Sequence, residues 1–286
     1  MLLEGIETLF VLAEAKTMSK AGSLLYISQS AVSKRIHHLE KKLGKKLIEP
    51  QGRYVRLTNE ALTLIDKISP TFNELRGLIY EQSISDQNNT PIKIDCSETL
   101  ISGYFGALLS SAIQLDRHII LSTNHTPRII ENVKSGKATM GLCAGFVPSH
   151  TGLLKFHLFD EKFYIVSNDV LDTLPSQLIT TDLSNSANAY QSVILEKLDI
   201  QPIMQLDSYT AAAHLALSGA APALIPLSIL NALGIDKSKV YYFSELDDLI
   251  RPVHICVRQN NYNLSRVKNL IQQFCDYSYE SNVLNS

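Results

Sequence analysis

The chain has 286 residues, 45% of them hydrophobic, which is long enough for two or three domains with buried cores. Its net charge of −2 hides an uneven distribution: residues 1–60 carry ten Lys or Arg against six Asp or Glu, and the remainder carries sixteen against twenty-two. A basic head on an acidic body is typical of binding to nucleic acid through one module. No apolar run approaches the ~18 residues of a membrane-spanning helix, and the first ten residues are acidic and lack a positive leader, so we expect a soluble, cytoplasmic protein with no membrane partner.

The four cysteines give no sign of a metal site. Cys96, Cys143, Cys256 and Cys275 are widely scattered, with no CxxC pair and no zinc-ligand spacing. Three of them lie in apolar runs, where cysteine usually behaves as a small buried hydrophobe. No cationic surroundings that would lower a thiol pKa are visible. A thiol-based redox sensor is therefore only a minor alternative.

The first regular segment predicts two helices joined by a tight corner. One helix spans Ser19–Ile27, and Ser28 directly after it is a good N-cap for the next, because its hydroxyl can accept a bond from an unpaired first-turn amide. Helices joined this closely cross at a steep angle, which is the helix-turn-helix arrangement. The second helix carries an apolar stripe at spacings of four, three and four, formed by Val32, Ile36, Leu39 and Leu43.

The opposite face of the second helix is polar and cationic, which suits a DNA major groove. Small polar side chains at its start can meet base edges, and cations further along can meet phosphates. A charged helix face is in most proteins simply solvated, so the conjunction with a helix pair and a wing is what favours DNA. The residues expected to contact double-stranded DNA are Ser28, Gln29, Ser30, Ser33, Lys34 and His37.

A two-stranded wing is predicted after this helix. The strand-like runs Lys46–Glu49 and Tyr54–Leu57 lie on either side of Gly52. Arg53 and Arg56 flank that turn and are expected to reach the DNA backbone or a minor groove.

Many positions across Ile6–Ala61 follow one family pattern in order: Ala21, Ser28-Gln29, Ser33, Leu39-Glu40, Leu43-Gly44, Leu47 and Leu57-Thr58. On these residues the segment resembles the DNA-binding domain of LysR-type transcriptional regulators. The resemblance implies a winged helix-turn-helix domain over residues 1–58. There are departures that could alter which bases are read: Gly22 stands where alanine is usual, Ser30 where proline is common, and Ile48 where an aromatic is common.

Residues 59–82 predict one long helix that links the head to the body. Its heptad-like seam buries well only against another helix. Packing on the chain's own body is the alternative, but the position behind a DNA-reading module and the resemblance both favour pairing of copies in a homodimer or homotetramer. Pro70 is expected to kink or interrupt the helix, at a cost of ~3 kcal/mol. The seam consists of Ala61, Ile65, Ile68, Phe72, Leu75 and Ile79.

The polar residues 83–91 predict a hinge, and beyond them strand-like and helix-like runs alternate. Alternation of this kind indicates an α/β domain with a parallel sheet covered by helices. The first strands are expected at Ile92–Cys96, Ile119–Ser122 and Met140–Ala144, and the first helices at Leu100–Leu115 and Arg128–Ser135.

In open sheets of this type ligands bind beyond the carboxyl ends of the strands, where helix N-termini offer free amides to an anion. Two such junctions are rich in hydroxyl groups, Ser97-Glu98-Thr99 and residues 122–126. A single Ser, Thr or Asn before a helix more often caps that helix than contacts a ligand. No cluster of arginines is visible at these junctions, so a strongly charged effector is not demanded.

Residues 92–286 resemble, more loosely, the effector domain of the same family, which is similar to periplasmic solute-binding proteins. The resemblance implies two α/β subdomains, the first over about 92–162 and 227–286 and the second over about 163–226, with a small-molecule effector in the cleft. Thr139 stands where aspartate is usual, and Pro222 where a second glycine is usual. The later strands Val240–Phe243 and Val253–Val257 are expected to complete the first subdomain. The residues expected to bind the effector are Ser97, Thr99, His125, Thr126, Phe146 and Tyr209.

Catalysis is not favoured, because no nucleophile with a base, no phosphate loop and no metal-ligand spacing is discernible. The favoured function is a DNA-binding transcriptional regulator of the LysR type, controlled by a small molecule. The alternatives are a regulator without an effector, constitutive or controlled by a partner, and, less favoured, the redox sensor. RNA polymerase is a further expected partner, and no cofactor or metal is expected.

Overall fold

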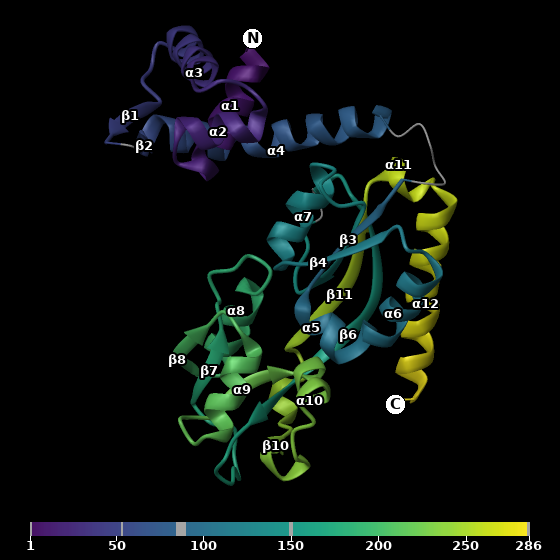
Figure 1. Ribbon diagram of the computed structural model, residues 1–286. Coiled ribbons are helices and arrows are strands. Elements are labelled where there is room, and N and C mark those ends of the chain that lie inside the picture. The colour runs from purple at the N-terminus through teal and green to yellow at the C-terminus, as the bar shows by residue number, and fades with distance from the viewer. Residues whose placement is uncertain (1, 53, 84–89, 149–150, 285–286) are drawn as a thin grey trace. The chain divides into compact units, whose positions relative to one another are not determined.

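The computed structural model describes residues 2–52, 54–83, 90–148 and 151–284. The chain divides into two compact units, Met1–Phe72 and Asn73–Ser286, and each is considered by itself (Figure 1). The predicted hinge at 83–91 lies mostly outside the described residues. Within the described part of the chain, no helix is both long and apolar enough to cross a membrane.

The first unit holds the predicted helix pair and wing. Its elements are α1 (Leu2–Ala15), α2 (Met18–Leu25), α3 (Gln29–Leu43), β1 (Ile48–Gln51), β2 (Tyr54–Leu57) and the beginning of α4 (Asn59–Ser83). Helix α2 ends two residues before the predicted Ile27, because Tyr26 adopts a left-handed conformation with φ of 56°. A methyl group on Gly22 would lie 2.7 Å from the carbonyl oxygen of Ile27, so glycine permits the close approach of the chain at this corner.

The apolar stripe of α3 packs into the core of this unit, with one exception. Val32, Ile36 and Leu39 are buried, whereas Leu43 is 40% exposed, so the stripe predicted from the sequence ends one turn early. The reason is that α3 ends there: Gly44 takes a left-handed conformation and the chain leaves for the wing. The wing pairs Gln51 with Tyr54, and β1 starts two residues later than predicted.

Glu40 fixes the start of the wing to α3. Its side chain is buried, and its Oε1 accepts hydrogen bonds from the backbone amides of Leu47 at 2.8 Å and Ile48 at 3.4 Å. Its Oε2 lies 3.2 Å from Nζ of Lys46. One carboxylate therefore satisfies the amides of the segment that leads into β1.

Helix α4 continues through Pro70 without the interruption predicted there. The first part of its seam belongs to the core of the first unit: Ala61 is fully buried, and the ring of Phe72 stacks on Phe10 with centroids 5.2 Å apart. Further along the helix, Ile79 is 62% exposed. Ala61 and Phe72 are thus used within the first unit, a packing on the head that the sequence did not predict.

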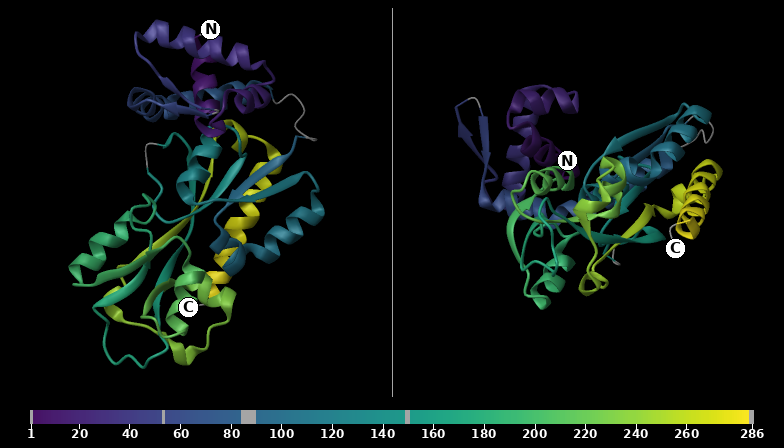
Figure 2. Two further views of the ribbon diagram at one scale, coloured as in Figure 1. Left: turned by 60° about the vertical axis from the view of Figure 1, so that its left-hand side comes forward. Right: turned by 90° about the horizontal axis from the view of Figure 1, so that it is seen from below.

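The second unit contains one mixed sheet with helices around it (Figures 1 and 2). The strands lie in the order β4-β3-β5-β11-β6-β9-β7-β8, with β10 beside β6. β3 is parallel to β4 and β5, but β6 and β11 run antiparallel to their neighbours, so the sheet is not wholly parallel as predicted. The strands are β3 (Ile92–Cys96), β4 (Ile119–Thr123), β5 (Met140–Ala144), β6 (Leu154–Val166), β7 (Gln177–Thr181), β8 (Gln201–Leu206), β9 (Ala223–Pro226), β10 (Val240–Tyr241) and β11 (Ile250–Val257).

Most helices of this unit lie between successive strands, and two follow the last strand. The segment after β3 is one continuous helical run of three pieces, α5 (Glu98–Leu100), a π-helical turn (Ile101–Phe105) and α6 (Gly106–Leu115). The others are α7 (Thr126–Lys134), α8 (Ala189–Lys197), α9 (Tyr209–Leu217), α10 (Leu227–Leu233), α11 (Gln259–Tyr262) and α12 (Ser265–Leu284).

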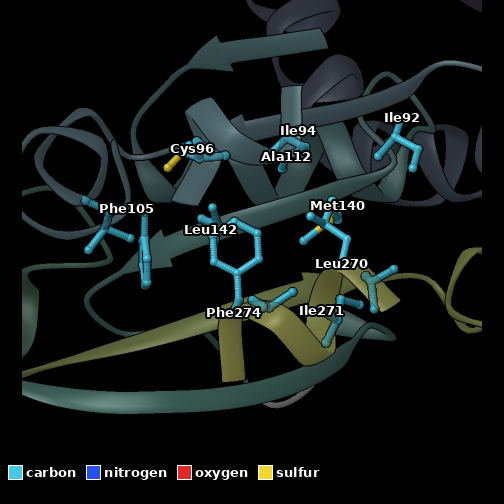
Figure 3. Packing of buried hydrophobic residues seen from close by; sticks show 14 of the residues in the cluster. Ile92, Ile94, Cys96, Phe105, Ala112, Met140, Leu142, Leu270, Ile271 and Phe274 are labelled. Carbon is cyan, nitrogen blue, oxygen red and sulfur yellow. The ribbon is translucent and has the colours of Figure 1, made fainter. Parts of the chain in front are cut away.

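The second unit has two main hydrophobic cores, one in each subdomain. In the first, Ile271 and Phe274 of α12 point towards Met140 and Leu142 of β5 (Figure 3). The second gathers the far half of β6 with β7, β9, α9 and α10. Strands β6 and β11 pair with each other along Leu154–Lys162 of β6, and β6 then continues into the second subdomain to pair with β9.

The boundary between the subdomains differs from the prediction. Leu230, Leu246 and Leu249 pack in the second core, and β10 pairs with the far half of β6. The segment 227–249 was assigned to the first subdomain, but it belongs with the second, and the chain returns only with β11. Short elements such as β10 carry no sequence signal for the sheet they join, which explains the error.

Candidate functional sites

The polar face of α3 is open to solvent in the first unit. Ser28 caps the helix, because its Oγ accepts a bond from the amide of Ala31 at 3.2 Å. With the opposite face held in the core, the polar face projects from a rigid support. All six residues predicted for this face are exposed: Ser28, Gln29, Ser30, Ser33, Lys34 and His37.

The side chains on this face differ in whether they already form hydrogen bonds within the protein. The hydroxyls of Ser28 and Ser30 lie 2.9 Å apart and form a hydrogen bond. Gln29, Ser33 and His37 form no side-chain hydrogen bond with any residue that the structure describes. Their donors and acceptors are therefore free for base edges, the groups that carry sequence information in DNA.

The wing and the corner of the helix pair add to this surface. Arg56 is exposed on β2, opposite Glu49 in the register of the hairpin, and Arg53 lies outside the described residues. Sequence reasoning missed Tyr26, which is 96% exposed two residues before the Ser28 cap. An exposed aromatic beside a helix-turn-helix corner was the signal that could have identified it.

A polar cavity of about 300 Å³ lies between the two subdomains of the second unit. Five of the residues predicted for an effector site line it. Phe146 does not: it is 51% exposed and lies outside this lining. The full lining is Ser97, Glu98, Thr99, Thr123, Asn124, His125, Thr126, Ala144, Thr181, Asn185, Ala187, Asn188, Asp207, Ser208, Tyr209 and Arg251.

Four helices present their N-termini to this cavity. The residues that precede the helical runs starting at α5, α7, α8 and α9 are Ser97, His125, Asn188 and Ser208, and all four line the cavity. The first two come from the first subdomain and the last two from the second. Amides in a first helical turn lack helical partners, and the helix dipole adds partial positive charge, so the cavity favours an anionic group.

Thr126 has a structural role. Its Oγ1 donates to the carbonyl of Ala144 at 2.7 Å and accepts from the amide of Ala144 at 3.1 Å, which ties α7 to the end of β5. The hydroxyls of Ser97 and Thr99 lie 3.2 Å apart and form a hydrogen bond. Tyr209 is buried, and its hydroxyl accepts from the Gln191 amide at 3.3 Å.

Arg251 is the residue in this cavity that sequence reasoning missed. It lies on β11 and is only 3% exposed. Its Nε donates to Glu161 at 2.6 Å, and its Nη2 donates to Thr99 at 3.1 Å and to Ser228 at 3.0 Å. Its guanidinium lies over the Tyr209 ring, 5.4 Å from the centroid. Burial acts to lower the pKa of Arg251, but the Glu161 carboxylate raises it overall, so the group stays charged.

A contact between an imidazole and a carboxylate joins the subdomains at the cavity. Nε2 of His125 lies 3.5 Å from a carboxylate oxygen of Asp207, and both side chains are well exposed. His125 precedes α7 in the first subdomain, and Asp207 precedes α9 in the second. The pair is therefore sensitive to the separation of the two subdomains.

The cysteines do not favour redox sensing. Cys96, Cys143 and Cys256 are buried, and burial raises the pKa of the Cys96 thiol. A hydrogen bond with Cys256 and then burial raise the pKa of Cys143, and burial raises that of Cys275. Reactive cysteines need a lowered thiol pKa and exposure. No group of metal-ligating side chains is found among the described residues.

Together, a winged helix with an exposed polar recognition face and a domain with a cavity between its two subdomains define a DNA-binding regulator with a ligand-binding domain. Comparison with known proteins identifies the family of this regulator. Residues 3–62 match the family model of the bacterial regulatory helix-turn-helix protein, lysR family, and residues 85–277 match that of the LysR substrate binding domain.

The chain belongs to the LysR family of bacterial transcriptional regulators. It is 57% identical over 96% of both chains to an uncharacterized HTH-type transcriptional regulator of Vibrio cholerae serotype O1. Full-length OxyR from Pseudomonas aeruginosa, in a variant form, shares its fold with a TM-score of 0.61 at 17% identity over 97% of this chain and 94% of that one. The LysR family regulator CbnR does so with a TM-score of 0.60 at 17% identity, over 97% and 99%.

Proposed function

We propose that this regulator reads its operator with the N-terminal half of α3 and is controlled by a small molecule bound in the polar cavity. The observation that carries the proposal is the exposed face of α3, with unpaired hydrogen-bonding groups on a helix whose other face is fixed in the core. Gln29 and Ser33 are assigned to base edges. Lys34, His37 and Arg56 are assigned to the phosphate backbone. RNA polymerase is included as a partner because a regulator of transcription acts on its binding or escape.

DNA binding tests the assigned roles, with the DNA that flanks the protein's own coding region as the probe. Gln29→Ala should relax the preference at particular bases, because a side-chain amide reads a base edge. Lys34→Ala should weaken binding to all duplexes alike and lower the salt slope by about one, because a phosphate contact is lost. The matched control is Lys197→Ala, at the exposed C-terminal end of α8. Equal losses on operator and random DNA for Gln29→Ala would remove that residue from base reading.

We also propose that the protein pairs with a second copy through the part of α4 that its own head leaves uncovered. Ala61 and Phe72 are used within the chain, whereas Ile79, the last position of the predicted heptad seam, is 62% exposed, so this end of the seam is open to a second helix. Ile79→Glu should shift the sedimentation of the full-length protein towards a smaller species. Leu62→Glu, at an exposed position near the start of the same helix, is the control. An unchanged oligomer for Ile79→Glu would exclude this face.

Effector control is supported by the cavity between the subdomains, because a polar cavity of this kind has no packing role. A regulator without an effector would bind its operator identically whatever small molecule fills the cavity. The test measures thermal stability of the full-length protein against a metabolite panel, and then operator occupancy with each molecule that stabilises it. A stabilising molecule that leaves occupancy and footprint unchanged would contradict control through this cavity.

A further inference from the structure

We propose that the cavity binds a small zwitterion of the amino-acid type, with its carboxylate at the helix N-termini and Arg251, and its ammonium group at Glu98 and Asp207. This inference rests on the proposed function, because it names the chemical class of the effector. It goes beyond that function by requiring both an anionic and a cationic group in one small ligand.

The size and lining of the cavity restrict the ligand first. A volume of about 300 Å³ lies at the lower end for ligand sites, so the ligand is small. Among the described lining residues, only Ala144 and Ala187 have purely apolar side chains, and the ring of Tyr209 is already covered on one side by Arg251. A large apolar or aromatic body would leave these hydroxyls, amides and charges unpaired, which is costly. The ligand is therefore polar throughout.

The anionic end of the ligand is assigned to Arg251 and the helix N-termini of the lining. Four helix N-termini converge there, two from each subdomain. Arg251 gives an independent indication: it is 97% buried, lines the cavity, and uses its Nε and Nη2 for protein partners, while its Nη1 donates to none of the residues that the structure describes. A ligand carboxylate would accept from Nη1 and from whichever of the Ser97 and Thr99 hydroxyls does not donate to the other.

The position of the ligand's ammonium group follows from the charged side chains of the lining other than Arg251. Glu98 and Asp207 line the same cavity from opposite subdomains, and both are exposed. The charge of Arg251 is already balanced by Glu161, so the lining as a whole carries excess negative charge. A ligand with only anionic groups would leave two carboxylates facing it, with the His125 imidazole 3.5 Å from Asp207 beside them. An ammonium group supplies three donors for these carboxylates and removes the conflict.

The test uses the full-length protein and isothermal calorimetry with the common amino acids. Each amino acid that binds is compared with two matched molecules, the 2-hydroxy acid in which a hydroxyl replaces the amine, and the amine that lacks the carboxylate. We expect the amino acid to bind at least about tenfold more tightly than either, because each loses a charge-assisted contact. Asp207→Asn should weaken amino-acid binding about tenfold and leave 2-hydroxy-acid binding unchanged or tighter. Asp172→Asn, at an exposed carboxylate on the same subdomain and outside the cavity, is the matched control and should behave as the wild type.

The outcomes separate this inference from the proposed function. Equal binding of the 2-hydroxy acid, or preferential binding of a neutral sugar included in the same panel, would overturn the zwitterion and leave effector control standing. No binding by any small molecule, with operator binding intact, would overturn the zwitterion and effector control together while leaving the DNA-binding role. An amino acid whose affinity does not change in Asp207→Asn and in Glu98→Gln would overturn the assignment of its ammonium group.

Discussion

The buried pair of Glu161 and Arg251 gives the sharpest prediction. Glu161 is 1% exposed and Arg251 is 3% exposed. Besides Arg251, Glu161 accepts from the hydroxyl of Tyr104 at 3.1 Å and from the amide of Ser228 at 2.5 Å. Glu161→Gln removes the charge and leaves the guanidinium uncompensated in the interior. Breaking a buried pair in this way costs about 3–5 kcal/mol, much more than the net value of the pair itself.

The matched double variant decides whether that reasoning holds. Glu161→Leu combined with Arg251→Met removes both charges. The remaining cost comes from the Ser228 amide and the Tyr104 hydroxyl, which lose their acceptor, and is about 1–3 kcal/mol. The double variant should thus unfold at a higher urea concentration than either single variant. Because the chain has no tryptophan, unfolding is followed by far-UV circular dichroism and tyrosine fluorescence. Losses in the double variant that equal the sum of the single losses would refute the uncompensated charge as the cause.

Three further predictions concern other parts of the chain. Glu40→Ala should lower the free energy of unfolding by about 2–3 kcal/mol and weaken DNA binding, because the amide of Leu47 loses its acceptor. Glu40→Gln should cost less. Urea unfolding measures the stability of both variants, and operator titration measures their DNA binding. Burial and then nearby positive charge lower the pKa of His254 from 6.5 to about 4, so the unfolded chain takes up the proton first and stability falls as pH drops through that window. His254→Gln should remove about 1–2 kcal/mol of that loss, less than the full pKa shift implies because the imidazole is only partly buried, and this is seen as a flatter pH dependence of the denaturation midpoint. Gly103→Ala should cost about 1–3 kcal/mol in thermal unfolding, since its methyl group would come within van der Waals overlap of Ser228.

Local signals were enough for the elements whose ends are marked by their own residues. The strands Ile92–Cys96 and Met140–Ala144 have the bounds predicted from the sequence, because each is a short apolar run between polar junctions. Ser28 caps α3 as predicted, because its hydroxyl accepts a bond from a first-turn amide, whereas Ser97 precedes α5 without a side-chain capping bond. Four of the residues that line the cavity from the first subdomain followed from these junctions.

Contacts between strands that are distant in the chain could not be predicted from the sequence. Arg251 and Glu161 are 90 positions apart, and each by itself resembles a solvent-exposed charge in a strand. Only the antiparallel register of β6 and β11 places them opposite each other and buries both. The same pairing makes β6 thirteen residues long, where the sequence predicted only the strand Phe163–Val166. A charged residue in the interior of a strand is thus informative only once its partner strand is known.

The position of Arg251 also connects the cavity with the joint between the subdomains. Its guanidinium contacts Thr99 in the first subdomain and Ser228 and Tyr209 in the second. Two residues after Arg251, between Val253 and His254, the register of β11 with β6 shifts, and such bulges are where strands bend. A change in the angle between the subdomains that is taken up at this bulge would therefore move the guanidinium relative to the helix N-termini. An occupant that bonds to both sets of groups favours the arrangement in which it reaches both, and it can shift the balance only by the difference between its affinities for the two arrangements.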